Sequence, residues 1–405
     1  MSNRPASASV AIIGAGPAGL MAAEILATAG HAVTIYDRMA SVGRKFLMAG
    51  RGGLNLTHSE PLPQFLTRYG AAEDWLTPAI TAFPPDALRA WAEGLGQETF
   101  VGSSDRVFPR RLKTSPLLRA WLLRLEQLQV RIVPQHDWIG WTDDKALQFR
   151  TPSGAVETVR SDATLLALGG ASWPRLGSTG AWRDILTARD IAVTPFTPAN
   201  SGFMLDWSEN FQTRFAGEPL KTVAITHGSH RLRGEAMITT YGIEGGAVYA
   251  LSAELRATLA RDGKAVLSID LRPDLTTDAL RQRLDRVRAN QSLANRLRKG
   301  AGLTPLAINL MREATDLHAT ADLAALIKAV PLHITGVQPL ARAISSAGGI
   351  ARADLDAQFM LRKFPGVFAA GEMLDWEAPT GGYLLQASFA TAVAAAKGIT
   401  DWLNP

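Results

Sequence analysis

Short apolar runs alternate with glycine-containing turns in the N-terminal part of the chain. The apolar, β-branched segment Ser9–Ile13 stops abruptly at Gly14, which is typical of a buried parallel strand. A helix is predicted over Pro17–Thr28, because proline is favoured in a first helical turn and Gly30 follows as a stop signal. A second apolar strand is predicted at residues 32–36. This order predicts a β-α-β unit of a parallel sheet.

The loop between the first strand and the helix has the pattern of a dinucleotide-binding turn. We expect Gly14 to permit the turn, Gly16 to let the backbone approach a pyrophosphate, and Gly19 to let the helix pack on the strand. The free amides and the dipole at the helix start attract phosphate. Asp37 follows the second strand, where a carboxylate can accept hydrogen bonds from a ribose diol. The candidate cofactor residues are Gly14, Ala15, Gly16, Pro17, Ala18, Gly19, Asp37 and the adjoining Arg38.

A segment near the C-terminus favours FAD over NAD as the dinucleotide. FAD is the longer cofactor, and we expect it to contact residues far along the chain as well. Residues 364–372 form an apolar run that ends in Gly371 and Glu372. The Glu372 carboxylate is expected to accept a hydrogen bond from a ribityl or neighbouring hydroxyl. The alternative is a strand that only completes the sheet.

Two further glycines, Gly381 and Gly382, precede an Ala-rich segment predicted to be helical to about Lys397. The free amides at such a helix start would face the flavin N1 and C2 carbonyl, where negative charge develops on reduction. Tyr383, at the start of that helix, is a candidate flavin-packing ring or proton donor, or else a structural residue.

Alternating segments at residues 130–133, 138–141 and 147–150 predict a three-stranded antiparallel meander. The apolar run at residues 163–170, which ends in paired glycines, is expected to return to the cofactor. A meander of this kind replaces a crossover helix in FAD domains of glutathione-reductase type. The candidate cofactor contacts from this part of the chain are Val133 and Gly169.

Composition limits the chemistry. The 405 residues exceed the size of a typical single domain, so two or more domains are expected. The absence of cysteine excludes disulfides, thiolate zinc sites, iron–sulfur clusters and a thioether-linked flavin. The seven histidines lack ligand spacing, so no metal is expected. No apolar run is long enough for a membrane span, and we expect a cytoplasmic protein without a membrane partner.

The net charge of +5 suits an enzyme that binds an anionic dinucleotide or an acidic substrate. Residues 277–328 are expected to be helical and are rich in arginine. Contact with RNA or DNA is one interpretation of this segment, but a solvated helical face is favoured, because no aromatic residues alternate with the arginines to stack on bases. We therefore do not expect a nucleic-acid partner.

Residues 42–57 carry the sequence VGRKFLMAGRGGLNLT, which resembles the HI0933-like flavoprotein family. Some members of that family are described as aminoacetone oxidases or bile-acid reductases. The resemblance implies an α/β fold with a discontinuous, Rossmann-like FAD-binding domain of glutathione-reductase type at residues 1–195 and 346–405. It also implies an inserted substrate or cap domain at residues 196–345, β-barrel-like with a helical part at about 277–328. Further matching segments are residues 105–109, 168–174, 177–180, 334–336, 347–349 and 371–386.

The chain departs from the family in one segment. The usual Gly-Arg-Cys-Asn is replaced by Gly-Gly-Leu-Asn at residues 52–55, so the arginine and the cysteine are both missing. Chemistry that depends on that thiol is therefore not expected, and the chain fits a distinct subgroup. Arg44, Lys45 and Arg51 are candidates to meet the pyrophosphate or an anionic substrate. The alternative for these three is a solvated basic loop.

The sequence therefore predicts an FAD-dependent oxidoreductase that transfers a hydride between flavin N5 and a small organic substrate. NAD(P)H is a candidate electron donor, although the chain has no second glycine loop followed by an acid. Two alternatives stay open: an RNA-binding or RNA-modifying flavoprotein, and a non-enzymatic flavin redox sensor. No catalytic residue is assigned from the sequence.

Overall fold

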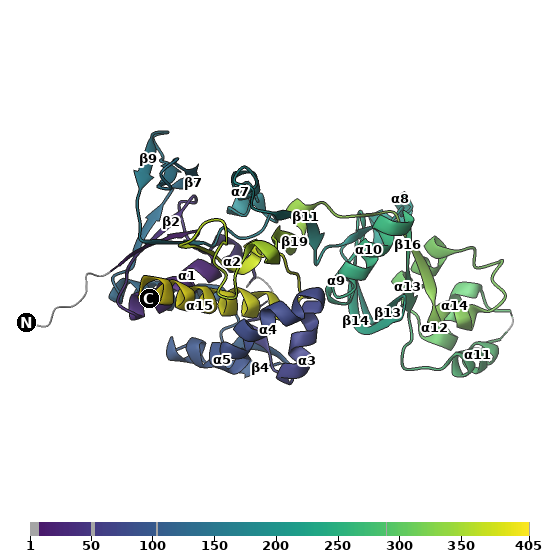
Figure 1. Cartoon of the computed structure of the whole chain (residues 1–405). Helices are drawn as coiled ribbons and strands as arrows, with labels where there is room; N and C mark the ends of the chain where they lie inside the picture. Colours follow the sequence, from purple (N-terminus) through teal and green to yellow (C-terminus); the bar gives the residue numbers. More distant parts are fainter. Residues whose placement is uncertain (1–7, 50–52, 103, 289, 405) are drawn as a thin grey trace, which may run out of the picture. The chain divides into compact units, whose positions relative to one another are not determined.

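The computed structural model describes residues 8–49, 53–102, 104–288 and 290–404 (Figure 1). The candidate residue Arg51 lies outside the described residues. The chain divides into two compact units. The first unit comprises Met1–Thr197 and Ile344–Pro405, and the second, here called the insert, is Pro198–Ala343. The first unit is therefore discontinuous in sequence.

A five-stranded sheet in the order β20-β10-β1-β2-β6 forms the centre of the first unit, and all of its strand pairs are parallel. Four of the five residues of β1 are buried, as expected for a strand covered on both faces. The α/β class predicted from the sequence is confirmed by this sheet and its helices. The strands are β1 (Ser9–Ile13), β2 (Ala32–Asp37), β6 (Arg131–Pro134), β10 (Ala163–Leu166) and β20 (Val367–Ala369).

Two helices next to this sheet lie side by side, α1 (Pro17–Thr28) and α15 (Tyr383–Leu403) (Figure 1). The turn at Gly371 also approaches α1 closely, because a Cβ added there would lie 2.9 Å from the Cβ of Ala18 in α1. The bounds predicted for α1 are confirmed. Helix α15 continues six residues beyond the predicted end at Lys397, because Ile399 and Leu403 still pack on the core.

The predicted meander is partly wrong. Residues 130–133 were expected to be its first strand, but β6 joins the parallel sheet beside β2. The reason is α6 (Thr114–Gln127), which precedes β6 and acts as a crossover between parallel strands. The antiparallel meander consists of the next two predicted strands, β7 (Asp137–Trp141) and β8 (Leu147–Arg150), and an additional one, β9 (Val156–Val159).

The rest of the first unit surrounds the sheet. A small antiparallel sheet has the order β3-β5-β4, and β11 (Val193–Ala199) pairs with β19 (Ser345–Ile350). The strands of the small sheet are β3 (Thr57–His58), β4 (Thr99–Val101) and β5 (Arg106–Pro109). The further helices are α2 (Arg44–Ala49), α3 (Leu62–Leu66), α4 (Glu73–Ala82), α5 (Pro85–Gly94) and α7 (Trp182–Thr187).

The insert has a separate hydrophobic core and a seven-stranded antiparallel sheet of order β17-β16-β13-β14-β15-β12-β18. Its strands are β12 (Phe203–Met204), β13 (Pro219–His227), β14 (His230–Thr239), β15 (Gly242–Glu244), β16 (Ala265–Asp270), β17 (Val330–Ile334) and β18 (Gly336–Val337). No ladder joins the edge strands β17 and β18 within the described residues, so barrel closure stays a prediction.

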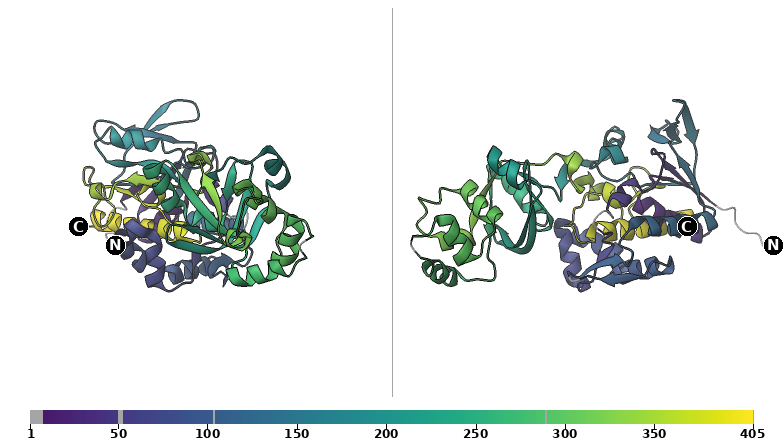
Figure 2. Two further views of the ribbon diagram at one scale, coloured as in Figure 1. Left: turned by 90° about the vertical axis from the view of Figure 1, so that its right-hand side faces the viewer. Right: turned by 180° about the vertical axis from the view of Figure 1, so that it is seen from behind.

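Seven helices of the insert are described, and α11, α12 and α14 gather at one end of it in Figures 1 and 2. The helical part predicted at about residues 277–328 corresponds to four helices, which end at Lys328. The helices are α8 (Glu209–Phe215), α9 (Gly246–Tyr249), α10 (Ser252–Asp262), α11 (Thr277–Asp285), α12 (Leu293–Ala301), α13 (Pro305–Ala314) and α14 (Leu323–Lys328).

Candidate cofactor site

A cavity of about 500 Å³ lies in the first unit at the carboxyl ends of β1, β2, β10 and β20. Ligands of open parallel sheets bind at this edge. Segments from both ends of the chain line the cavity, although they are separated by more than 300 residues. Of the residues predicted to hold a cofactor, the cavity is lined by Gly14, Ala15, Gly16, Pro17, Ala18, Asp37, Arg38, Arg44, Lys45, Gly169, Glu372, Gly381 and Gly382.

Four predicted cofactor residues do not line this cavity: Gly19, Val133, Gly371 and Tyr383. Gly19 lets the first turn of α1 pack against the end of β1, because a Cβ added at Gly19 would lie 1.9 Å from the carbonyl oxygen of Gly14. Gly371 permits the approach of α1, as described above. Val133 pairs with Tyr36 inside the parallel sheet.

The glycine loop opens onto the cavity at Gly16. Gly14 has a φ of +107°, and an added Cβ would lie 2.3 Å from the carbonyl oxygen of Ala167, so only glycine fits there. A Cβ added at Gly16 would meet no described atom within 4 Å. Gly16 is the N-cap of α1, no side chain caps that helix, and its first turn holds no acid. The unpaired amides there are available to an anion.

Asp37 fixes the loop from the end of β2. One carboxylate oxygen accepts a hydrogen bond from the amide of Ala15 at 2.7 Å, and the other accepts one from the amide of Met39 at 2.8 Å. Burial raises the pKa of Asp37 above its usual value, and the two amide hydrogen bonds with nearby Arg38 and Arg44 offset this only in part. Each oxygen keeps a lone pair for a hydroxyl donor from the cavity.

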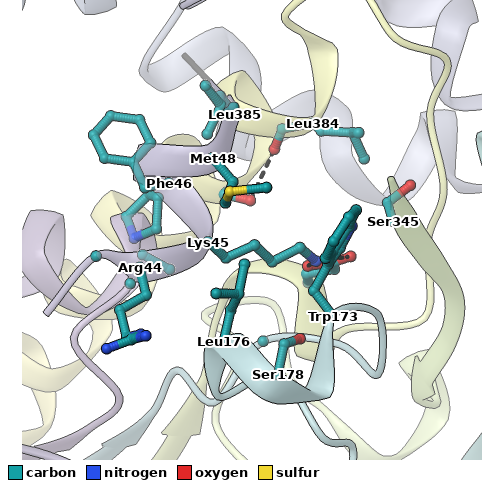
Figure 3. A pocket seen from close by; sticks show the side chains of 18 of the residues that line it. Arg44, Lys45, Phe46, Met48, Trp173, Leu176, Ser178, Ser345, Leu384 and Leu385 are labelled. Atoms are coloured by element: carbon teal, nitrogen blue, oxygen red, sulfur yellow. Dashed lines mark hydrogen bonds and ion pairs between the residues drawn. The ribbon is translucent and has the colours of Figure 1, made fainter. Parts of the chain in front are cut away.

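Lys45 and Glu372 form an ion pair in the cavity wall, with Nζ 2.7 Å from Oε2. The ammonium also donates to the hydroxyl of Ser172 at 2.7 Å, and the Ser346 amide donates to Oε1 of Glu372 at 3.0 Å. In Figure 3, Lys45 reaches toward Trp173, whereas its neighbour Arg44 extends in another direction. Successive residues of a helix point about 100° apart, so the two cations serve different parts of the cavity.

Tyr383 is 4% exposed and does not line the cavity. Its hydroxyl donates to the carboxylate of Glu60, its ring stacks on His58, and Glu60 also accepts from Arg68. Burial and the Glu60 hydrogen bond raise the pKa of the Tyr383 phenol. Burial alone would raise the pKa of Glu60, but the hydrogen bonds from Arg68 and Tyr383 outweigh it and hold that pKa low. This cluster holds Tyr383, the first residue of α15, which follows Gly382 in the chain.

Several residues that line the cavity were not predicted from the sequence, among them Asn55, Arg106 and Trp173. All three lie in segments that resemble the family, but no local pattern indicates that they face a common cavity. Trp173 has a φ of +59°, which is uncommon for a bulky residue. Such strained residues concentrate at binding sites. An apolar lining completes the cavity, with Phe46, Met48, Leu168, Leu176, Ile344, Trp376, Leu384 and Leu385.

The fold and the cavity define a Rossmann-type protein that binds a dinucleotide across the carboxyl ends of its parallel strands. The chain matches the family described as HI0933-like protein Rossmann domain over residues 8–398, so it belongs to that family. It is an FAD-dependent oxidoreductase of this family.

Two curated relatives cover nearly the whole chain at low identity, and a third covers part of it. A 3-dehydro-bile acid delta(4,6)-reductase of Clostridium scindens is 23% identical over 97% of this chain and 99% of its own. A ribosomal RNA dihydrouridine synthase of Escherichia coli is 26% identical over 96% of this chain and 97% of its own. For a protein of the same name from Haemophilus influenzae, 26% identity covers only 60% of each chain.

A solved structure with the same fold is 3-ketosteroid delta1-dehydrogenase from Sterolibacterium denitrificans. Its TM-score is 0.54 at 12% identity, and the superposition covers 98% of this chain and 100% of that one. This similarity supports the Rossmann-type fold predicted from the sequence.

The residues of the cavity fit FAD. The open space at Gly16 and the uncapped start of α1 suit a diphosphate, and the buried Nε of Arg44 has no partner in the described structure. The cavity also extends to a second helix start at Gly381 and Gly382, which a single mononucleotide would not require. When bound, FAD supplies the hydride-transfer chemistry, and the chain supplies orientation and electrostatics.

Metal clusters and membrane-spanning helices are two features that the described part of the chain does not show. No group of three or more His, Asp or Glu side chains is arranged to hold a metal ion there. None of the described helices has the length and apolarity that a membrane crossing requires.

Proposed function

We propose that the cavity holds FAD in an extended arrangement. Asp37 would accept hydrogen bonds from the adenosine ribose, and Gly16, Ala18 and Arg44 would meet the diphosphate. Gly381 and Gly382 would meet the flavin ring. The start of α15, which is held by the Tyr383–Glu60 hydrogen bond, would keep these two glycines in place. The observation that carries this proposal is the lining of one cavity by the glycine loop, Asp37 and the Gly381 and Gly382 turn.

We further propose that the reaction is hydride transfer between flavin N5 and a carbon–carbon bond conjugated to a carbonyl group. Both kinds of relative carry names that describe reduction of a ring: a delta(4,6)-reductase and a dihydrouridine synthase. A hydride can be added to such a bond because the carbonyl oxygen takes up the charge. The apolar lining around Trp173 suits a flat organic ring.

NAD(P)H is the proposed electron donor and would visit the same cavity, since the sequence has no second dinucleotide-binding unit. Anaerobic stopped-flow reduction of the FAD-loaded protein by NADH and by NADPH tests this choice of electron donor. Reoxidation is then followed with a panel of cyclic enones and with uridine in RNA. We expect one nicotinamide to reduce the flavin and an enone to reoxidise it. Reduction by neither nicotinamide, with no reoxidation of photoreduced protein by any acceptor, would contradict the proposal.

RNA is a second candidate substrate. Two relatives are named for ribosomal RNA, and exposed Arg283, Arg286, Arg288, Arg298 and Lys299 on or beside α11 and α12 form no ion pair with any described residue. Reoxidation of the reduced flavin by RNA, but by none of the small enones, would favour this candidate over the first.

A further inference from the structure

Arg106 differs from the other charged residues that line the cavity. Glu372 and Lys45 neutralise each other, and Asp37 is held by two amides. Arg38 lies 3.5 Å from Asp137, and Arg44 donates to a serine hydroxyl. The guanidinium of Arg106 makes no hydrogen bond or ion pair with any residue that the structure describes. Its guanidinium therefore leaves an uncompensated positive charge in the cavity wall.

The position of Arg106 is set by the small β3-β5-β4 sheet. Arg106 is opposite His58 and its neighbour Val107 is opposite Thr57 in the β3–β5 pairing. The backbone of Thr57 touches the turn before α15, since a Cβ added at Gly382 would lie 2.4 Å from the Cα of Thr57. Arg106 therefore belongs to the part of the cavity formed by the Gly381 and Gly382 turn, where the reaction is proposed to occur.

Asn55 adds a second polar group in this part of the cavity, two residues before Thr57. Its Oδ1 is buried and has no hydrogen-bond partner among the described residues. A buried polar atom without a partner costs about 1–3 kcal/mol, so it indicates a ligand that supplies the missing hydrogen bond. A carboxamide can both donate and accept.

We propose that Arg106 binds a carboxylate of the substrate, with Asn55 hydrogen-bonded to the same end of the substrate. A guanidinium offers a planar pair of N–H donors that matches the two oxygens of a carboxylate. The phosphates of FAD have their own partners at the start of α1 and at Arg44, so the charge of Arg106 is left for the substrate. The substrate class is thus a small planar carboxylic acid anion whose ring packs on the apolar lining.

This inference rests on the proposed function, because it assigns the reacting end of the cavity to the substrate. The experiment is a titration of the FAD-loaded, full-length protein with benzoate and with benzamide, its uncharged counterpart, followed by the visible absorption of the flavin. It requires no turnover, so a failure of the redox chemistry would not affect it. The variants are Arg106→Gln and the control Arg110→Gln, whose side chain is 68% exposed and pairs with Glu98 outside the cavity.

For the wild type and Arg110→Gln, we expect benzoate to bind at least about tenfold more tightly than benzamide. In Arg106→Gln, the affinity for benzoate should fall about 10- to 100-fold, while that for benzamide should change little. The proposal is overturned if the wild type does not bind benzoate, or if Arg106→Gln weakens both probes equally. It is also overturned if Arg106→Gln alone fails to retain FAD, because Arg106 would then serve the cofactor.

Discussion

Gly16→Val is expected to fold and yet to lose FAD. The backbone of Gly16 has φ −82° and ψ −178°, which any residue adopts, and an added Cβ would meet no described atom within 4 Å. Because valine is a poorer N-cap than glycine, the unfolding free energy of the apoprotein should fall by no more than about 1 kcal/mol. The new side chain would occupy the space in which the diphosphate approaches the amides of α1. We expect the FAD affinity to fall at least about 100-fold.

Two matched glycine variants separate this effect from misfolding. Gly14→Val should lose both FAD binding and stability, since its Cβ would overlap the carbonyl of Ala167. Gly94→Ala, at the end of α5 and outside the cavity, should keep both. Equilibrium titration of each apoprotein with FAD and thermal unfolding provide the measurements. A Gly16→Val protein that binds FAD as tightly as the wild type would refute the assignment of the diphosphate to this loop.

Asp37→Ala is expected to have the second largest effect, because the carboxylate holds the glycine loop as well as facing the cavity. Its removal leaves the amides of Ala15 and Met39 without these acceptors. An acceptor lost from a fully buried donor costs about 1–3 kcal/mol, and both hydrogen bonds are only partly buried, so the unfolding free energy of the apoprotein should fall by about 2–4 kcal/mol rather than the upper limit of about 6 kcal/mol. The loss of the ribose contact and the loosened loop should weaken FAD binding about 10- to 100-fold. Chemical denaturation and FAD titration measure the two effects.

Asp137→Ala is the control for Asp37→Ala. The Asp137 side chain is 39% exposed, belongs to the first residue of β7, and contacts Arg38 from outside the cavity lining. A surface pair of this kind contributes at most about 1 kcal/mol. Equal losses of stability in the two variants would contradict the role given to Asp37.

The β-α-β unit could be predicted from the sequence because each of its parts has a local pattern. An apolar run, three spaced glycines, a proline at the helix start and a terminal acid fix β1, α1 and β2 within about 30 residues. The strand at residues 131–134 was placed in the wrong sheet, because a four-residue apolar run does not specify its partner. Its place beside β2 is fixed by the crossover through α6, which is a long-range property.

The candidate site could be predicted where a local pattern marks the residue, as at the glycines of the loop and at Asp37 after β2. Asn55 and Arg106 come together because β3 and β5 pair across about 50 residues, and no local periodicity encodes that pairing. Tyr383 shows the opposite case. Its position next to Gly382 suggests contact with the flavin, but its hydroxyl donates to the carboxylate of Glu60, and neither residue lines the cavity. Side-chain direction at a helix start depends on such tertiary partners.

If this cavity binds FAD through the glycine loop, each chain should bind a single FAD molecule. Purified wild-type apoprotein is titrated with FAD while flavin fluorescence is recorded, and Gly16→Val is titrated in parallel. We expect the wild type to saturate at a single FAD per chain, with no saturation of Gly16→Val over the same range. A wild type that does not saturate, or a variant that saturates identically, would contradict binding of FAD through the glycine loop.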